Sequence, residues 1–403
     1  MMRVVLINRY FYPDHSATAQ LLTELAEDLD ARGERVTVIT SRCTYLGYST
    51  ALAPRDRLKG IEIIRIATTR FGRGRTWGRL IDYLSFYLMT LWTTARLGKQ
   101  DCLVVMSDPP LLSFLAAVSR WLTGTPTVCW LQDIYPDIAI RAGVLSEGMG
   151  AKVIRLIARW SLHRMDRTVE LGRCMERHLL REGVPGHRIV TIPNWADTSL
   201  IQPVDRRDNP FVREQGLEDR FVVMYSGNLG VVHDVETLLA VIRESRSIPS
   251  IAFCFVGEGR HLRPLRETAR RESWDHVRFV SYQSKELLRF SLSSAHLHLV
   301  TLRNDMLGLC VPSKIYGIMA AGRPMLYIGP EESEAASAIR ESRSGFVVRP
   351  GDWQWAAEVI RMCHEDPTRC EQMGQAARDY ARQYAHRTMA TTQFWQVLRE
   401  VAA

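Results

Sequence analysis

Two stretches of this chain decide its fold: Phe221-Val-Val-Met-Tyr-Ser-Gly-Asn-Leu-Gly230 and Val311-Pro-Ser-Lys-Ile-Tyr-Gly-Ile-Met-Ala-Ala-Gly-Arg-Pro324. The first joins an apolar run to a glycine-rich turn, which predicts a buried strand leading through a tight turn into a helix. The second predicts a helix that opens at Pro312 and Ser313, stops at Gly322 and leads into another apolar run. Strand, turn and helix in this order are typical of a parallel α/β sheet.

Both stretches also offer groups that bind phosphate oxygens. A glycine turn exposes backbone N–H groups, and a helix start leaves N–H groups unpaired beside a partial positive charge. We therefore expect Gly227, Asn228 and Gly230, together with Ser313 and Lys314, to hold a diphosphate. The ligand expected from this chemistry is a nucleotide-linked substrate. The alternative is a plain strand-to-helix turn, and a helix cap followed by a surface lysine.

The 403 residues alternate short apolar runs with helical stretches in two successive series. Nearly continuous apolar runs are typical of parallel strands that are covered by helices on both faces. The expected strands are 3–8, 35–40, 61–66, 102–106 and 127–130 in the first half, and 221–225, 251–256, 277–280, 296–301 and 325–328 in the second. This pattern predicts an α/β fold of two doubly wound, Rossmann-like domains.

A proline and an asparagine interrupt the pattern in Ile192-Pro-Asn-Trp-Ala-Asp197, and a polar stretch follows. We place the domain boundary here, which gives an N-terminal domain over 1–195, a C-terminal domain over 196–375 and a last helix over 376–403. Ligands of open α/β sheets bind beyond the carboxyl ends of the strands. The active site is therefore expected in a cleft that the two domains face.

The basic excess of the chain lies entirely in its first half. Residues 1–195 hold 26 Lys and Arg against 18 Asp and Glu, whereas residues 196–403 hold 26 of each. A basic half suits nucleic acid or an anionic membrane surface. Its basic residues do not alternate with aromatic ones as in a nucleic-acid-binding module, so we expect a membrane partner and no nucleic acid. The eight cysteines contain no Cys-x-x-Cys pair and the histidines form no ligand cluster, so no metal site is expected.

The strongest membrane candidate is Arg70-Phe-Gly-Arg-Gly-Arg-Thr-Trp-Gly-Arg79, which precedes an apolar run over 80–95. The residues expected to face the membrane are Arg73, Arg75, Trp77 and Arg79. The run is shorter than the ~20 residues that a spanning helix needs. A second basic and apolar helix over 152–164 is expected on the same face, which would dock on an anionic surface. An ordinary amphipathic core helix is the alternative.

Five further motifs, in a fixed order along the chain, carry a family resemblance together with the closing Ala320-Ala-Gly-Arg-Pro324 of the second stretch. They are Tyr12-Pro-Asp14, Gln132-Asp-Ile-Tyr-Pro136, Ile192-Pro-Asn194, Glu236-Thr-Leu-Leu239 and Phe255-Val-Gly-Glu-Gly259. With the two opening stretches they span essentially the whole chain, which resembles the retaining glycosyltransferases of the B-type fold, family four. Within that family it is similar to the bacterial cell-surface polysaccharide branch, of the fucosamine-transferase-like type.

The resemblance implies transfer of a sugar from a nucleotide-diphosphate donor, with UDP as the expected nucleotide, to a hydroxyl of a lipid-linked glycan acceptor. It also implies retention of the anomeric configuration, no cofactor, no metal, and a peripheral place at the inner face of the cytoplasmic membrane. The N-terminal domain is then the acceptor and membrane side, and the C-terminal domain binds the nucleotide-sugar. By the same resemblance, the helix over 376–403 crosses back to the first domain.

The chain departs from the family pattern in its donor site. The family carries a Glu-x7-Glu pair where this chain has Leu309 and Gly317. The second glutamate normally holds the ribose hydroxyls, and we expect Glu334 to replace it. The family's Arg and Lys beyond the first glycine of the loop correspond to Asn228 and His233, which leaves the lysine of Pro-Ser-Lys as the expected countercharge to the diphosphate.

The resemblance also indicates further candidate residues. The residues expected to contact the nucleoside are Gly257, Glu258, Tyr282 and Glu334. The alternative for Gly257 is a plain turn, and the alternative for Tyr282 is packing in the core. Asp133 follows an apolar strand and is expected to face the reacting sugar as the catalytic carboxylate; its alternative role is a backbone cap. In the N-terminal cleft loop, Ser16 and Ala17 replace the usual Gly-Gly, which narrows the room for close backbone approach.

Two functions of other classes stay open at this point. A nucleotide-sugar isomerase of the non-hydrolysing 2-epimerase type would share the two-domain architecture and need no lipid acceptor. A non-catalytic scaffold of a polysaccharide assembly complex would explain the missing glutamate pair.

Overall fold

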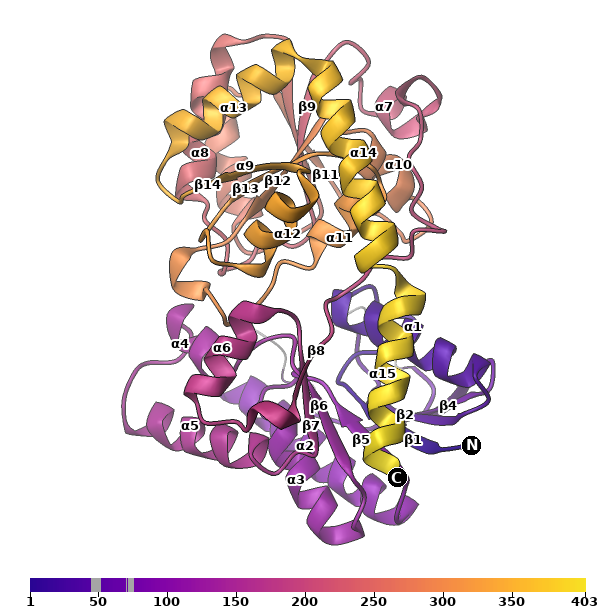
Figure 1. The fold of residues 1–403 in the computed structure, drawn as a ribbon. Coiled ribbons are helices and arrows are strands. Elements are labelled where there is room, and N and C mark those ends of the chain that lie inside the picture. The colour runs from indigo at the N-terminus through magenta and orange to yellow at the C-terminus, as the bar shows by residue number, and fades with distance from the viewer. Residues whose placement is uncertain (45–51, 70, 72–75) are drawn as a thin grey trace. The chain divides into compact units, whose positions relative to one another are not determined.

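The computed structural model describes residues 1–44, 52–69, 71 and 76–403, which form two compact units (Figure 1). Unit 1 consists of Met1–Pro193 and Thr388–Ala403, and unit 2 of Asn194–Arg387. Each unit is built on a mostly parallel sheet between helices, with consecutive buried apolar residues in its central strands. The predicted fold class, two doubly wound α/β units, is confirmed.

Unit 1 carries an eight-stranded sheet in the order β3-β4-β2-β1-β5-β6-β7-β8, in which only β3 runs antiparallel to its neighbour. Its strands are β1 (Arg3–Ile7), β2 (Arg35–Ser41), β3 (Arg55–Leu58), β4 (Ile61–Ile66), β5 (Cys102–Val105), β6 (Thr127–Trp130), β7 (Arg167–Glu170) and β8 (Ile189–Thr191). Its helices are α1 (Ala17–Ala31), α2 (Thr76–Leu97), α3 (Leu112–Thr123), α4 (Asp137–Arg141), α5 (Met149–Leu162), α6 (Arg173–Arg181) and, from Thr388 on, α15 (Arg387–Ala402).

Unit 2 carries a six-stranded parallel sheet in the order β11-β10-β9-β12-β13-β14. Its strands are β9 (Phe221–Ser226), β10 (Ile251–Val256), β11 (Val277–Val280), β12 (Leu297–Thr301), β13 (Met325–Ile328) and β14 (Gly345–Val348). Its helices are α7 (Pro210–Glu214), α8 (Glu236–Glu244), α9 (Leu262–Arg271), α10 (Leu288–Ser293), α11 (Lys314–Ala320), α12 (Glu334–Ser342), α13 (Trp353–Glu365) and α14 (Pro367–Tyr384).

Four strands of the structure lie outside the ten expected ranges: the three-residue β8, and three that lack the apolar run on which the predictions rested. β3 is the exposed, polar edge strand Arg55-Asp-Arg-Leu, and β7 has Val169 as its single aliphatic residue. β14 is a half-buried edge strand that starts at a glycine. These strands form because they pair with a neighbouring strand, which is a tertiary influence on a weak local preference.

The C-terminal part differs from the single helix expected over 376–403. α14 ends at Tyr384 and α15 starts at Arg387, because the chain between them pairs with Ala196: the Ala196 N–H donates to the Ala385 carbonyl at 3.1 Å. A bridge also joins Ala196 and His386. Residues 376–387 therefore belong to unit 2, and only Thr388–Ala403 belong to unit 1.

Aromatic packing holds α15 in unit 1. The fully buried Phe394 lies 4.6 Å from Trp130 between ring centroids. Two hydrogen bonds add to it: the Thr391 hydroxyl donates to Asp28 at 2.8 Å, and the Trp395 indole N–H donates to Glu34 at 2.8 Å. The last helix is thus part of the core of unit 1.

Replacing Phe394 by alanine should lower the free energy of unfolding of unit 1 by about 3–5 kcal/mol, because it removes a buried aromatic ring and leaves a cavity. Scanning calorimetry, which can resolve the transitions of two units, is the measurement. Gln396→Ala, on the exposed side of the same helix, is the control. A loss below about 1 kcal/mol would show that α15 is not part of the core.

Candidate donor and carboxylate sites

The strand order of unit 2 places one loop pair in the position where open α/β sheets bind ligands. β10 and β11 lie on one side of β9, whereas β12, β13 and β14 lie on the other. The loops that follow β9 and β12 therefore leave the sheet in opposite directions. Such a switch point opens a crevice at the carboxyl ends of the two strands. The predicted diphosphate residues come from these two loops.

The structure brings Gly227 and Lys314 together. A Cβ added to Gly227 would lie 3.7 Å from both Cε and Nζ of Lys314. The Lys314 Nζ lies 3.6 Å from the ring centroid of Tyr225 and donates to its hydroxyl. That hydroxyl in turn donates to the carbonyl oxygen of Asn228 at 3.0 Å. Tyr225, near the end of the strand before the loop, thus positions both the lysine and the glycine loop.

The charge of Lys314 has no acidic counterpart in the part of the chain that the structure describes. Burial lowers the pKa of the Lys314 ammonium well below its usual value, and no carboxylate opposes this lowering. An ammonium removed from water without a counterion is destabilising, and an anion bound beside it would compensate. The site is therefore arranged to receive a negative group.

The glycine loop after β9 meets the loop after β10. The Leu229 N–H donates to the Glu258 carbonyl at 2.8 Å. Cβ atoms added at Gly257 and Gly259, both with positive φ, would lie 2.6 Å from the Gly227 oxygen and 2.5 Å from the Leu229 nitrogen. Glycine is thus required by this close approach, which brings the predicted nucleoside residues Gly257 and Glu258 to the predicted diphosphate loop.

The remaining predicted residues of unit 2 lie at the same edge of the sheet. Ser313 precedes α11 and makes no side-chain cap bond; Asn228 is exposed beside Gly230. Tyr282 is 39% exposed after β11, and the half-buried Glu334 is the first residue of α12, after β13. A Cβ at Gly317 would lie 3.6 Å from Leu292 Cδ1, so this position faces α10. The replacement of the ribose-binding glutamate by Glu334 stays a prediction.

The sequence missed Tyr225, Arg303 and the environment of His233. Tyr225 is part of an apolar strand, where the pattern indicates only core packing. Arg303 donates to the Val231 carbonyl at 3.1 Å and to Asp305 at 2.6 Å, which joins the loop after β12 to the loop after β9. Burial and the nearby Lys314 lower the pKa of His233 to about 3, so its ring is neutral at pH 7.

In unit 1, Asp133 lies after β6 in the position that the sequence predicted. The Ser107 hydroxyl oxygen accepts from the backbone N–H groups of Gln132 and Asp133 at 3.1 and 3.2 Å. Burial and the neighbouring Asp108 carboxylate raise the pKa of Asp133 to about 7. The sequence missed Asp108, although it follows the apolar run 102–106 just as Asp133 follows 127–130. A carboxyl group that titrates near pH 7 can exchange a proton in a reaction.

The other predicted residues of unit 1 lie at helix starts. Ser16 is the N-cap residue of α1; its N–H donates to Asp14 at 2.8 Å, and its buried hydroxyl has no partner among the described residues. Ala17 begins the helix and is exposed. Arg73 and Arg75 fall outside the described residues. Trp77, 78% exposed, and the half-buried Arg79 lie in the first turns of α2.

A metal-binding cluster and a membrane-spanning helix are both absent from the described ranges. Three or more His, Cys, Asp or Glu residues never gather there in a way that could hold a metal ion. Within the same ranges, every helix is too short or too polar to cross a membrane.

Known proteins match both units. Residues 17–195 match the model of the glycosyl transferase 4-like domain, and residues 208–380 match that of glycosyl transferases group 1. The probable glycosyltransferase WbjE of Pseudomonas aeruginosa is 29% identical over 290 residues, 71% of this chain and 72% of that protein. The putative colanic acid biosynthesis glycosyl transferase WcaI of Escherichia coli is 26% identical over 337 residues, 80% of this chain and 82% of that protein.

Solved structures resemble the fold over nearly the whole chain. Anabaena Alr3699/HepE in complex with UDP-glucose has a TM-score of 0.77 at 15% identity, covering 99% of this chain and 100% of that one. WaaG, a glycosyltransferase involved in lipopolysaccharide biosynthesis, has a TM-score of 0.69 at 14% identity, covering 96% of this chain and 98% of that one. At these identities the likeness concerns the fold.

Replacing Asp133 by asparagine should stabilise the protein increasingly as the pH rises from about 4 to about 7. The pKa of Asp133 rises from an ordinary 3.8 to about 7 on folding, so the folded wild type holds a proton that the unfolded chain has released. Wild-type stability therefore falls across this window, and the Asp133→Asn substitution removes that loss. Thermal melts from pH 4 to pH 8 measure the difference. The exposed Asp219→Asn is the control, and a pH-independent difference for Asp133→Asn would contradict the assignment.

Proposed function

The chain is a family-four glycosyltransferase of the B-type fold and belongs to bacterial polysaccharide biosynthesis, and on this premise we propose its donor, its acceptor and its catalytic groups. It transfers a sugar from a UDP-linked donor to a hydroxyl of a lipid-linked glycan acceptor, with retention of the anomeric configuration. Support for the nucleotide comes from HepE, a protein of the same fold that was solved with UDP-glucose, with UDP and glucose, and with UDP.

The observation that carries the donor proposal is the Lys314 ammonium beside the Gly227 turn. The ammonium lies against the Tyr225 ring without an acidic partner among the described residues, at the point where the loops after β9 and β12 leave the sheet in opposite directions. A diphosphate is the anion that suits a lysine next to a glycine loop with open N–H groups. As the bond to the sugar breaks, negative charge grows on the diphosphate, and Lys314 stabilises it.

The other residues have their roles in this scheme. Gly230, Asn228 and Ser313 complete the diphosphate site. The nucleoside is contacted by Gly257, Glu258, Tyr282 and Glu334. Asp133 faces the sugar, where a carboxyl group with a pKa of about 7 accepts the proton of the acceptor hydroxyl or stabilises positive charge at the anomeric carbon. No cofactor takes part, and the basic groups do the work that a divalent metal does in other transferases.

The acceptor side of the proposal concerns unit 1. This unit binds the lipid-linked acceptor, and Trp77 and Arg79 at the start of α2 contact an anionic membrane surface. The exposed indole of Trp77 and the basic excess of residues 1–195 support this. The protein is then peripheral at the inner face of the cytoplasmic membrane.

Calorimetric titration of UDP, GDP and dTDP into wild type and Lys314→Ala tests the donor site. UDP should bind at micromolar concentration, and the variant should bind it at least tenfold more weakly, about 1.4 kcal/mol. Lys314→Met, which keeps the aliphatic stem, should also melt above wild type without nucleotide, because it removes a buried charge. Lys59→Ala, an exposed lysine of unit 1, is the control. Equal binding by wild type and Lys314→Ala would remove Lys314 from the site, and no binding at all would favour the scaffold function.

Metal independence has its own test. Transfer activity should be unchanged in excess EDTA, because Lys314 and the backbone N–H groups stabilise the leaving diphosphate without a metal. The measurement is UDP release in the presence of acceptor lipid extract, with and without added Mg²⁺ or Mn²⁺. Loss of activity in EDTA that either metal restores would contradict this part of the proposal.

A further inference from the structure

Helix α2 turns a stripe of large apolar side chains outward and several polar ones inward. Its inward residues include the polar Asp82, Thr90 and Thr94 together with Phe86, each at most 3% exposed. Its outward stripe consists of large apolar side chains, each 44–78% exposed: Trp77, Leu80, Ile81, Leu84, Leu88 and Trp92. The hydrophobic effect favours the opposite arrangement in water. The outward side of α2 is therefore suited to an apolar environment.

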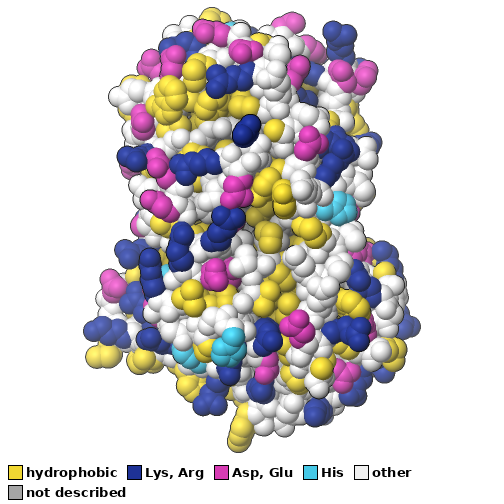
Figure 2. Space-filling view, in the orientation of Figure 1, with side chains coloured by type: hydrophobic (Ala, Val, Ile, Leu, Met, Phe, Trp, Pro, Cys, Tyr) yellow, Lys and Arg dark blue, Asp and Glu magenta, His cyan; other side chains and the backbone are white. Residues whose placement is uncertain are grey.

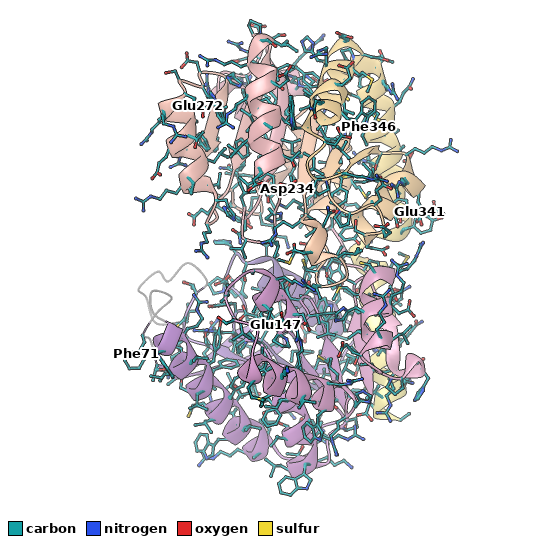
Figure 3. The ribbon with its side chains drawn as sticks, turned by 90° about the vertical axis from the view of Figure 1, so that its left-hand side faces the viewer. Phe71, Glu147, Asp234, Glu272, Glu341 and Phe346 are labelled. Atoms are coloured by element: carbon teal, nitrogen blue, oxygen red, sulfur yellow. The ribbon has the colours of Figure 1, made fainter. Side chains whose placement is uncertain are left out.

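Two buried polar side chains of α2, Asp82 and Thr94, are hydrogen-bonded in this orientation of the helix, whereas the buried Thr90 hydroxyl has no partner among the described residues. Asp82 accepts from the Thr69 hydroxyl at 2.8 Å and from the Phe71 N–H at 3.0 Å. The Thr94 hydroxyl donates to the Thr90 carbonyl at 2.8 Å. Rotating α2 to bury its leucines would break the bonds of Asp82. Phe71, 64% exposed, lies next to Gly78 at the start of the helix (Figure 3).

Two neighbouring helices continue the same surface. α3 packs against both α2 and α5, and the buried Ser113 and Ser161 hydroxyls join α3 to α5 at 2.7 Å. α3 exposes Phe114, Trp121 and Leu122, with Trp121 82% exposed. α5 exposes Met149, Val153, Leu156 and Trp160 and buries small residues such as Ala151 and Ala158. We call these outward apolar side chains of α2, α3 and α5 the three-helix face.

The charges around the three-helix face are basic. Asp82, which is buried, is the one acidic residue in the sequence of the three helices. Arg96 lies over the Trp92 ring at 3.5 Å and Arg164 over the Trp160 ring at 4.7 Å. Figure 2 shows apolar side chains interspersed with Lys and Arg at the lower rim of unit 1. Indole rings paired with arginines are suited to the boundary between lipid headgroups and acyl chains.

A shallow groove within this face is lined by Phe114, Leu156, Ile157 and Trp160, with Phe114 and Trp160 5.9 Å apart between ring centroids. Its lining is almost wholly apolar, so its occupant is a hydrocarbon chain or another apolar group. A partner protein would bring a face of its own shape, but the excess of basic over acidic residues on the three helices and the indole–arginine pairs favour an anionic lipid surface.

We propose that the three-helix face embeds in one leaflet of an anionic lipid bilayer, to the depth of its indole rings. This deepens the membrane part of the proposed function, on which it rests: the contact is not a basic patch at the start of α2 alone, but an apolar surface of three helices with a basic rim. Binding therefore has a hydrophobic part, which salt does not screen, and an electrostatic part, which salt does screen.

Flotation with phosphatidylcholine vesicles that contain phosphatidylglycerol tests the proposal, with wild type and Trp121→Glu. Wild type should float with the vesicles at low salt and keep a measurable part of its binding at about 0.5 M NaCl, where exposed charges are largely screened. Trp121→Glu should bind at least about tenfold more weakly, because it places a carboxylate in the apolar layer. Leu84→Glu on α2 should act alike, and Trp355→Glu, a 43% exposed tryptophan of unit 2, should bind as wild type does.

Titration of UDP into the same variants separates this proposal from the donor site. Trp121→Glu and Leu84→Glu should bind UDP as wild type does and melt at the same temperature, since both side chains point outward. Vesicle binding of Trp121→Glu equal to wild type, or complete loss of wild-type binding at high salt, would overturn the embedding. A lipid-free dimer that Trp121→Glu converts to a monomer, with vesicle binding unchanged, would assign the face to a second copy of the chain instead.

Discussion

The ammonium of Lys314 is the constraint on which the site of unit 2 depends. It lies against the ring of Tyr225 and donates to its hydroxyl, and no carboxylate of the described residues offsets the lowering of its pKa by burial. Holding a charge in this way costs stability in the free protein, because the group has lost part of its water. The cost is compatible with folding where a ligand supplies the missing charge. Sites of this kind are less stable than the fold around them and depend on it.

The rest of the unit 2 site follows from keeping that ammonium next to backbone N–H groups. Tyr225 must be in the strand so that its hydroxyl reaches both Lys314 and the Asn228 carbonyl. The loops after β9 and β10 must approach so closely that Gly257 and Gly259 have no room for a side chain. His233 stays neutral beside the lysine, since burial and the lysine itself oppose its protonation. The lysine, the tyrosine, the two glycines and the neutral histidine therefore belong to one closely packed arrangement of loops.

Unit 1 also holds side chains in environments that they usually avoid, at Asp133 and on α2. Asp133 and Asp108 follow adjacent strands, and burial together with their proximity raises the pKa of Asp133 to about 7. On α2, Asp82, Thr90 and Thr94 point inward beside Phe86, and Leu80, Leu84 and Leu88 point outward, an arrangement that folding in water does not require. The first arrangement suits the proposed role of Asp133 at the reacting sugar, and the second suits the proposed contact with lipid. A protein optimised for stability alone would have neither.

The sequence by itself determined the two-unit α/β fold, the Gly227 loop, the Pro-Ser-Lys segment and the place of Asp133, because continuous apolar runs, glycines and helix starts are local signals. Polar edge strands such as β3, the break between α14 and α15 at Ala385, and the outward direction of the α2 leucines were decided only in the tertiary structure. The same holds for Tyr225 and Asp108: the first has the pattern of a core residue, and the second gains its effect from a neighbour on another strand. Local periodicity specifies which elements form, whereas partners distant in sequence decide which face turns inward and which charge is left without a counterion.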